Sequence, residues 1–213
     1  MATLLYCVAK RDAPVIEALT GVGGDAVARS EMSKLSVFTS SSPDSTGWLR
    51  PQLQTSALEF HHVLREIFKV TTIIPFRFPT IFETDEQLIQ RLQERSAEYA
   101  GLLEKFSGLV QMEMRLTISA PKEPARSGTQ YLKKLQETMR SIETLAKTLR
   151  TSSAPVWRDW RARPSKEGVR AFALVERSRT AEFENLMARA TIPHGFSVRV
   201  SGPWPATEFM EPS

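Results

Sequence analysis

The sequence predicts an α+β protein made of two ferredoxin-like modules of βαββαβ type that are joined by a long helix. The first observation is that strand-like and helix-like segments follow one another in the same order in both halves of the chain. The second is composition, because 41% hydrophobic and 24% charged residues are ordinary values for a globular protein. A length of 213 residues leaves room for two small domains, each with its own core.

The first half opens with an uninterrupted apolar run at residues 3–9, which predicts a strand buried on both faces. A short helical piece at 14–19 and a strand pair at 25–29 and 32–38 should follow, before a loop at 39–51 that is rich in turn-forming residues. Ser56 and Glu59 have the spacing of a capping box, which predicts a helix to about Phe68. An extended stretch should then occupy residues 70–76.

A second capping box, Thr84 with Gln87, opens the predicted connecting helix. Its apolar residues recur at helical spacing: Leu88, Leu92, Tyr99, Leu103 and Phe106. We therefore predict an N-terminal modified ferredoxin-like domain at 1–83, a connecting helix at 84–108 and a C-terminal α+β domain at 109–213.

The second half has the clearer pattern. Residues 112–118 alternate strictly between apolar and polar, which predicts a strand with one face on the core and one in water. Ser127 and Gln130 should cap a helix with one apolar stripe. A strand pair at 156–163 and 169–175, a helix at 179–189 and a strand at 196–200 complete the module. The stripe of the capped helix consists of Leu132, Leu135, Met139, Ile142, Leu145 and Leu149.

Composition and motifs exclude several classes of function. A net charge of +4 is too small by itself to indicate nucleic-acid binding, and no apolar run approaches the roughly 20 residues of a membrane helix. We expect a cytoplasmic protein without a secretory signal. Cys7 is the single cysteine, and the adjacent His61 and His62 lack metal-chelating spacing. The sequence therefore predicts no enzyme, no metal site and no cofactor.

The segment at 157–163 interleaves tryptophan with arginine, a composition that can stack bases and neutralise phosphates. It lacks the aromatic and glycine-rich signature of RNA-recognition sheets. A surface strand with aromatic–arginine packing is the favoured prediction, and nucleic-acid binding remains the weaker alternative.

Two further segments stand out. In residues 73–82, Arg77 lies among apolar neighbours, which predicts either a structural arginine tied to the adjoining helix or an interaction surface. In the tail, Pro203 and Pro205 fix the backbone on both sides of Trp204. This tail could pin its own domain by burying Trp204 and Phe209, or it could bind a partner.

These two segments resemble the gas vesicle synthesis proteins GvpF and GvpL. Residues 73–82 are similar to the family's Leu-Leu-Pro-Leu-Arg-Phe-Gly-Thr-Val-Phe segment, with Pro79 in place of the usual glycine. Residues 202–205, with Phe209 four residues later, are similar to its C-terminal Gly-Pro-Trp-Pro-Pro-Tyr-x-Phe, with Ala206 and Thr207 in place of Pro-Tyr. The matching motif positions, which are candidates for structure or interaction, are Pro75, Arg77, Phe78, Thr80, Phe82, Gly202, Pro203, Trp204, Pro205 and Phe209.

The resemblance implies a two-domain α+β protein that helps to build gas vesicles in the cytoplasm. It implies contact with the small hydrophobic shell protein GvpA and with other accessory Gvp proteins, and it implies no catalysis, cofactor, nucleic acid or membrane. The alternative is a ferredoxin-like regulatory or ligand-binding module that is used outside gas vesicles.

Overall fold

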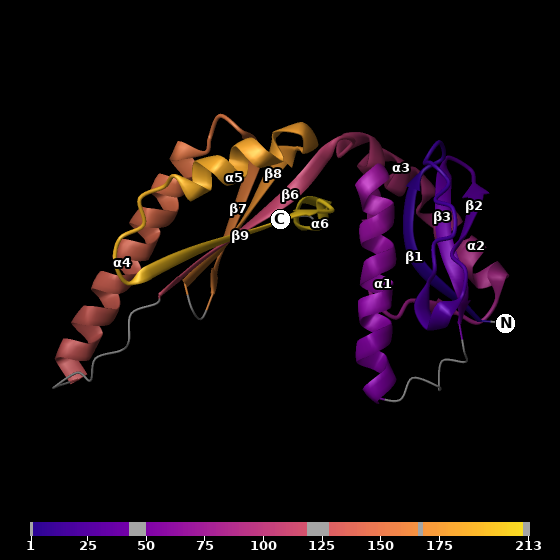
Figure 1. Ribbon diagram of the computed structural model, residues 1–213, viewed down its shortest axis with the longest axis horizontal. Coiled ribbons are helices and arrows are strands. Elements are labelled where there is room, and N and C mark those ends of the chain that lie inside the picture. Colours follow the sequence, from indigo (N-terminus) through magenta and orange to yellow (C-terminus); the bar gives the residue numbers. More distant parts are fainter. Residues whose placement is uncertain (1, 43–49, 119–127, 166–167, 211–213) are drawn as a thin grey trace. The chain divides into compact units, whose positions relative to one another are not determined.

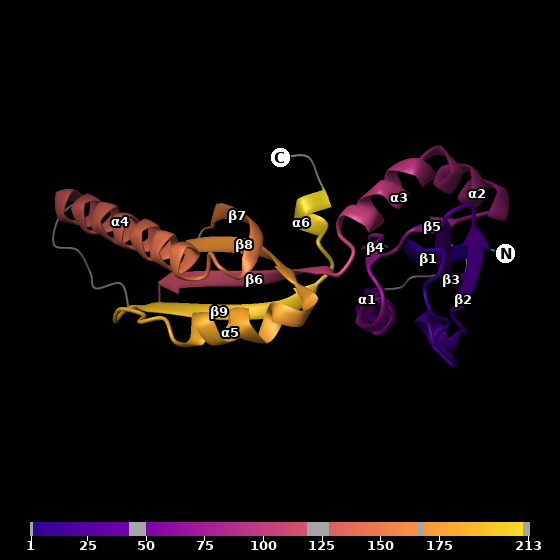
Figure 2. The same ribbon diagram turned by 90° about the horizontal axis from the view of Figure 1, so that it is seen from above.

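The structure is a computed structural model that describes residues 2–42, 50–118, 128–165 and 168–210 (Figure 1). The chain divides into two compact units, Met1–Gly108 and Leu109–Ser213. Each unit contains one antiparallel sheet with helices packed on it (Figure 2). The predicted α+β class is therefore confirmed. The predicted helix cap at Ser127 lies outside the described residues.

Unit 1 has the strand order of a ferredoxin-like sheet. The order is β2-β3-β1-β4, and β5 also pairs with β1. Its elements are β1 (Ala2–Lys10), β2 (Ala28–Met32), β3 (Leu35–Ser42), α1 (Arg50–Val70), β4 (Ile73–Pro75), β5 (Ile81–Phe82), α2 (Asp85–Glu94) and α3 (Ser96–Lys105).

The predicted helix at residues 14–19 is absent, so unit 1 lacks a helix between β1 and β2 that a regular ferredoxin-like module would have. Ala18 has a φ of 55°, which an α-helix does not accept. The connection between β1 and β2 instead holds a short 3-10 turn, Val22–Gly24. Side chains hold this turn in place, because the Val22 N–H donates to the Tyr6 hydroxyl at 2.9 Å and the Gly23 N–H donates to Glu59 at 3.0 Å.

Helices cover both faces of the unit 1 sheet. On one face, α1 stacks Phe60 against Tyr6 of β1 with ring centroids 4.8 Å apart. On the other face, α2 and α3 form a cluster with β1 and β3. This explains why residues 4–9 of β1 are completely buried, as the apolar run predicts. The cluster consists of Leu5, Val8, Leu35, Val37, Leu88, Leu92, Tyr99 and Leu103.

The predicted connecting helix is instead two helices that belong to unit 1. The helical backbone breaks at Arg95, whose φ and ψ are −116° and 11°, and the Ser96 hydroxyl donates to the carbonyl of Gln93. The predicted apolar stripe exists, but it packs on the sheet of unit 1 and does not bridge two domains. Thr84 caps α2 as predicted by accepting from the Gln87 N–H.

Unit 2 is a complete βαββαβ module with the strand order β7-β8-β6-β9. Its elements are β6 (Leu109–Ile118), α4 (Gly128–Ser152), β7 (Trp157–Ser165), β8 (Gly168–Glu176), a 3-10 turn (Arg177–Arg179), α5 (Thr180–Ala188), β9 (Phe196–Trp204) and α6 (Thr207–Met210). Helices α4 and α5 contribute to the core on one face of the sheet.

The strand predicted at 112–118 is confirmed as β6, but its second face does not simply face water. Met112, Met114 and Leu116 enter the core beneath α4 and α5. On the opposite face Gln111 and Glu113 are only 5% and 6% exposed. They are buried because β6 lies between two paired strands and because polar partners cover this part of the sheet.

Candidate interaction surfaces

The segment at 73–82 forms an interrupted edge strand along β1 in unit 1. Strand β4 pairs Pro75 with Cys7, and β5 pairs Phe82 with Thr3. Between them the chain stays attached, because the Phe76 N–H donates to Tyr6 and the carbonyl of Thr80 accepts from the Leu5 N–H, both at 2.9 Å. The motif therefore closes one edge of the sheet.

Two phenylalanines anchor this segment on opposite faces of the sheet. Phe76 packs edge-on against Tyr99 of α3 at 6.0 Å, and Phe78 packs against Phe60 of α1 at 5.2 Å. Arg77 lies between them and is exposed, and among the described residues its guanidinium makes no hydrogen bond or ion pair. The prediction of a structural arginine tied to the adjoining helix is therefore wrong. Aromatic packing ties the segment to its helices, and Arg77 is a surface group.

The Gly-Pro-Trp-Pro motif lies largely inside a strand, because β9 extends to Trp204 and pairs it with Gln111 of β6. Gly202 has a φ of 139°, and a Cβ there would lie 2.8 Å from Met112 Sδ and 3.0 Å from the Gln111 carbonyl. Only glycine fits such a close approach of two strands. The glycine of this motif is thus required by packing.

After Pro205 the chain turns into α6, which packs back on its own unit. Phe209 is 4% exposed, and the Arg161 guanidinium lies over its ring at 5.2 Å. The Glu208 N–H donates to Gln111 Oε1 at 3.0 Å, and Arg161 donates to the Glu208 carbonyl at 2.6 Å. The tail therefore pins its own unit through Phe209, while Trp204 is only half-buried.

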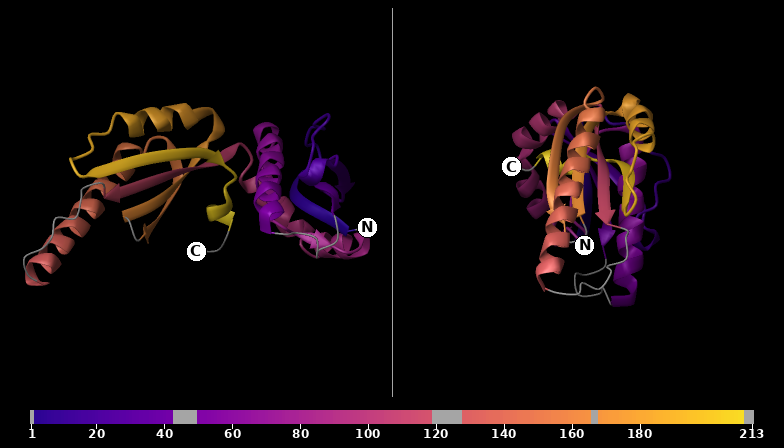
Figure 3. Two further views of the ribbon diagram at one scale, coloured as in Figure 1. Left: turned by 60° about the horizontal axis from the view of Figure 1, so that its bottom comes forward. Right: turned by 90° about the vertical axis from the view of Figure 1, so that its left-hand side faces the viewer.

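Helix α4 carries an apolar stripe that continues beyond the end of the sheet. Its C-terminal half buries Ile142, Leu145 and Leu149 in the core, but Leu132 is 59% exposed and Met139 is 46% exposed. Figure 3 shows the N-terminal half of α4 extending past the ends of the strands of unit 2. The stripe that the sequence predicts as core is therefore core at Ile142, Leu145 and Leu149 and surface at Leu132 and Met139.

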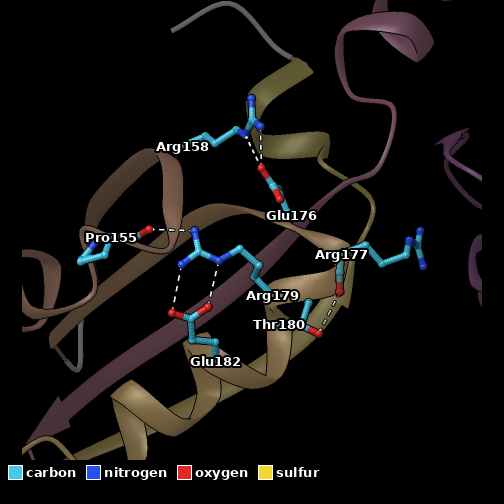
Figure 4. Close-up of polar contacts among 7 residues, drawn as sticks. All are labelled: Pro155, Arg158, Glu176, Arg177, Arg179, Thr180 and Glu182. Atoms are coloured by element: carbon cyan, nitrogen blue, oxygen red, sulfur yellow. Dashed lines mark hydrogen bonds and ion pairs between the residues drawn. The ribbon is translucent and has the colours of Figure 1, made fainter.

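A group of charged residues fixes the start of α5 (Figure 4). Arg179 binds Glu182 through two hydrogen bonds of 2.8 and 3.0 Å and donates a third, of 2.8 Å, to the Pro155 carbonyl. Arg158 forms an ion pair of 2.5 Å with Glu176. These interactions hold the turn before β7 against α5, so the positive charges of Arg158 and Arg179 are matched within the fold.

A hollow of about 950 Å³ lies between β1, β2 and α3 in unit 1. Its basic groups are largely paired with acidic neighbours, because Lys10 lies 2.6 Å from Glu104 and Arg11 lies 2.9 Å from Glu31. Such a lining offers little net charge to a ligand, so the hollow gives no strong support to the ligand-binding alternative.

The tryptophans and arginines of β7 separate to opposite faces of the sheet. Trp157 and Trp160 lie 5.8 Å apart and pack against the core beneath α4 and α5. Arg161 lies on the other face with α6. The predicted surface strand with aromatic packing fits this arrangement, whereas a base-stacking platform would need both groups on one face.

The described part of the chain contains no cluster of three or more His, Cys, Asp or Glu side chains able to hold a metal ion. Cys7 is fully buried in β1, and burial raises the pKa of its thiol. No helix among residues 2–42, 50–118, 128–165 and 168–210 is long and apolar enough to cross a membrane.

The ten motif positions divide between the two units. Unit 1 holds Pro75, Arg77, Phe78, Thr80 and Phe82, and unit 2 holds Gly202, Pro203, Trp204, Pro205 and Phe209. Strand pairing holds Pro75 and Phe82 in the sheet of unit 1 and Trp204 in that of unit 2, while Phe209 belongs to α6. The exposure of Leu132 and Met139 on α4 could not be predicted from the apolar stripe, because it depends on where the sheet of unit 2 ends.

Comparison with known proteins agrees with these features. Residues 2–211 match the gas vesicle synthesis protein GvpL/GvpF family. The fold is similar to the crystal structure of GvpF from Anabaena sp. PCC7120, with a TM-score of 0.81 at 13% identity over 100% of this chain and 97% of that one.

It is also similar to the crystal structure of GvpF from Microcystis aeruginosa, with a TM-score of 0.77 at 15% identity over 99% of each chain. No curated protein sequence matches the chain. At such low identity the two structures establish the fold, whereas the family match extends over nearly the whole sequence. The chain therefore belongs to the GvpL/GvpF family of gas vesicle synthesis proteins.

Proposed function

We propose that this protein acts in the cytoplasm as an accessory factor of gas vesicle assembly, through direct contact with the shell protein GvpA and with other accessory Gvp proteins. The observation that carries the proposal is the family match over residues 2–211. The proposed role requires no catalytic step and no cofactor.

The physical task of such a factor is to cover apolar surface. A shell subunit with one face toward gas exposes that face to water until it assembles, and large exposed apolar patches lead to aggregation. In this chain the surface that best suits the task is the exposed stripe of α4, with Leu132 at 59% and Met139 at 46% exposure. An apolar helix face can lie against another apolar segment and shield both from water.

The half-buried Trp204 is a second candidate contact, because tryptophan supplies a large apolar area with a polar N–H at its edge. It lies at the end of β9, apart from the exposed half of α4 within unit 2 (Figure 1). The two candidates can therefore be tested separately.

The test is co-expression of the full chain with GvpA, followed by co-purification. Wild type is compared with Leu132→Ser/Met139→Ser and with Trp204→Ala. The matched control is Leu58→Ser in α1, another leucine that is 67% exposed but lies in unit 1. Substitutions at the exposed Leu58, Leu132 and Met139 change the stability of a fold by only about 0.5 kcal/mol, so a loss of binding in the α4 variant can be assigned to the surface. Because Trp204 is half-buried, Trp204→Ala is compared only after circular dichroism shows that it is folded.

We expect wild type and Leu58→Ser to retain GvpA and the double variant in α4 to lose most of it. Failure of correctly folded wild-type protein to retain GvpA would contradict the proposal and favour the regulatory or ligand-binding module. Equal retention by all variants would keep GvpA as a partner and remove α4 and Trp204 as the contact.

A further inference from the structure

The face of the unit 2 sheet opposite α4 and α5 carries a row of arginines, one on each strand. Strand pairing places Arg163 of β7 beside Arg170 of β8, Arg170 beside Arg115 of β6, and Arg115 beside Arg199 of β9. Directly paired residues in a sheet lie about 4.5–5.5 Å apart at Cα, so the row crosses the whole sheet. We call the surface formed by Arg115, Arg163, Arg170 and Arg199 the arginine face.

This arrangement is unfavourable for the isolated sheet, since like charges directly opposite each other destabilise strand pairing. The side chains of Arg115, Arg163 and Arg170 are 57%, 57% and 45% exposed, and Arg199 is exposed as well. Water reduces the repulsion, but it leaves four guanidinium groups gathered on one surface.

Two carboxylates from the same unit offset part of the charge. Glu113 lies between Arg115 and Arg170 and accepts from the Nε of each at 2.6 Å. Glu208 of α6 lies 2.7 Å from Arg163. Among the described residues Arg199 makes no ion pair, so the row keeps an excess of positive charge over these two partners.

Helix α6 shows what kind of group this face holds. It brings the Glu208 carboxylate to Arg163 and the Phe209 ring beneath Arg161, so a short acidic and aromatic segment is held by guanidinium groups of the sheet. The contact of Arg163 with Glu208 is an ion pair through one carboxylate oxygen, Oε2, which accepts no hydrogen bond among the described residues. A guanidinium group also has planar donors that can match both oxygens of a carboxylate. Beyond α6, Arg115 donates only its Nε–H to Glu113 and keeps its remaining guanidinium N–H groups, and Arg199 makes no ion pair among the described residues.

Nucleic acid is the less favoured occupant. Single-stranded nucleic acid binds to positive grooves through exposed aromatic rings that stack on bases. The aromatic rings of this face are largely covered: Phe172 is 1% exposed beneath the Arg170 guanidinium at 4.9 Å, and Phe209 is 4% exposed beneath that of Arg161. Trp204, which pairs with Gln111 at the end of β9, is half-buried. Trp157 and Trp160 pack toward the opposite side of the sheet.

We propose that the arginine face binds an acidic segment of a partner protein, with carboxylates of that segment seated on Arg115 and Arg199. This surface is distinct from the apolar half of α4, so the proposal adds a second contact of opposite chemistry to the proposed function. Its test does not require GvpA, and the two proposals can fail independently.

The experiment uses the full chain and a fluorescein-labelled peptide of twelve residues that alternates glutamate and threonine. The matched glutamine–threonine peptide and a single-stranded oligonucleotide of the same net charge are compared by fluorescence anisotropy at low and high salt. The variants are Arg199→Gln and Arg115→Gln/Arg199→Gln. The control, Arg140→Gln, removes the same charge from an exposed position on α4.

We expect the acidic peptide to bind and the glutamine peptide not to bind, with affinity falling as salt rises. Arg199→Gln should weaken binding about 5- to 10-fold and the double variant about 30-fold or more, while Arg140→Gln changes it less than 2-fold. Absence of peptide binding, equal effects of Arg140→Gln and Arg199→Gln, or tighter binding of the oligonucleotide would each overturn the proposal.

Discussion

Glu113 is the residue on which the charge balance of the unit 2 sheet depends. It is 6% exposed and accepts three hydrogen bonds, one from Arg115 and two from Arg170. Burial by itself would raise the pKa of Glu113, but the hydrogen bonds and charges of Arg170 and Arg115 outweigh burial and hold this pKa below its usual value.

We predict that Glu113→Gln lowers the free energy of unfolding by about 1–2 kcal/mol at pH 7, because it leaves two arginines side by side without their shared carboxylate. A carboxylate whose pKa is lowered by folding stabilises the fold above its unfolded pKa of about 4.5 and loses this effect as pH falls further. The difference between variant and wild type should therefore shrink below pH 4.5. Urea unfolding across pH 3–7 measures it.

The control is Glu182→Gln, which removes an exposed partner of Arg179 and should cause a smaller loss. A difference between wild type and Glu113→Gln that does not change with pH would contradict the role given to the Glu113 charge.

For single residues, the sequence predicts which ones matter better than it predicts what each one does in the fold. It singles out Arg77, Gly202 and Phe209, but it cannot tell an exposed arginine from a tied one. The exposure of Arg77 follows from the opposite directions of Phe76 and Phe78, which depend on the helices that cover each face. The need for glycine at 202 follows from contact with Met112, some 90 residues earlier in the chain.

At the scale of elements, the two predicted capping boxes give opposite outcomes. Thr84 caps α2, because its side chain accepts from the Gln87 N–H and its backbone is extended. Ser56 lies inside α1, which begins at Arg50, so its spacing to Glu59 is coincidental. The spacing of a capping box is a weak signal by itself. A serine or threonine caps a helix only if the helix begins at that residue, and the spacing does not show where the helix begins.

We predict that Thr84→Ala lowers the free energy of unfolding by about 1 kcal/mol, because α2 loses a partner for one of its first N–H groups. Ser56→Ala serves as the matched change within a helix and should not carry this penalty. Urea unfolding monitored by circular dichroism compares the two variants. A larger loss for Ser56→Ala than for Thr84→Ala would contradict the helix boundaries described above.

Most strands could be predicted, because their alternating or continuous apolar patterns persist in the fold. The helix expected at 14–19 could not be excluded from local sequence alone, since the turn that replaces it depends on Tyr6 and Glu59, which are distant in sequence. Likewise the apolar stripe of α2 and α3 does not reveal which sheet it covers.

At the scale of the molecule, the division into two units means that each has its own core. Leu103 is fully buried in unit 1, and Phe183 is fully buried in unit 2. Cys7 is the only cysteine and is completely buried in β1. Its reaction with a thiol reagent should therefore require the opening of unit 1.

We predict that Leu103→Ala accelerates labelling of Cys7 at least ~30-fold, because deleting a buried leucine side chain costs about 2–5 kcal/mol and raises the open population accordingly. Phe183→Ala should leave the labelling rate nearly unchanged although it destabilises unit 2. Mass spectrometry after timed exposure to iodoacetamide gives the rates. Equal acceleration by both variants would show that the two units unfold as one.

The row of arginines on the unit 2 sheet could not be predicted from the sequence. Each arginine lies in a segment that the sequence identifies as a strand, but the row exists only through the register of three strand pairs. A shift of one residue in any pair would turn a strand over and move its arginine to the other face. The register of a strand pair depends on packing across the sheet, so it cannot be predicted from the residue pattern of one strand.

The strands at the sheet edges affect whether other β-strands can add to this protein. In unit 2, β7 carries Pro164 and a bulge near Asp159, while β9 carries Pro203 and a bulge opposite Gln111. In unit 1 the edge formed by β4 and β5 is interrupted between Pro75 and Ile81. These three edges resist the addition of a further strand, whereas the fourth edge, β2, carries neither a proline nor a bulge. An aggregate that grows by strand addition would therefore have to recruit this protein through β2.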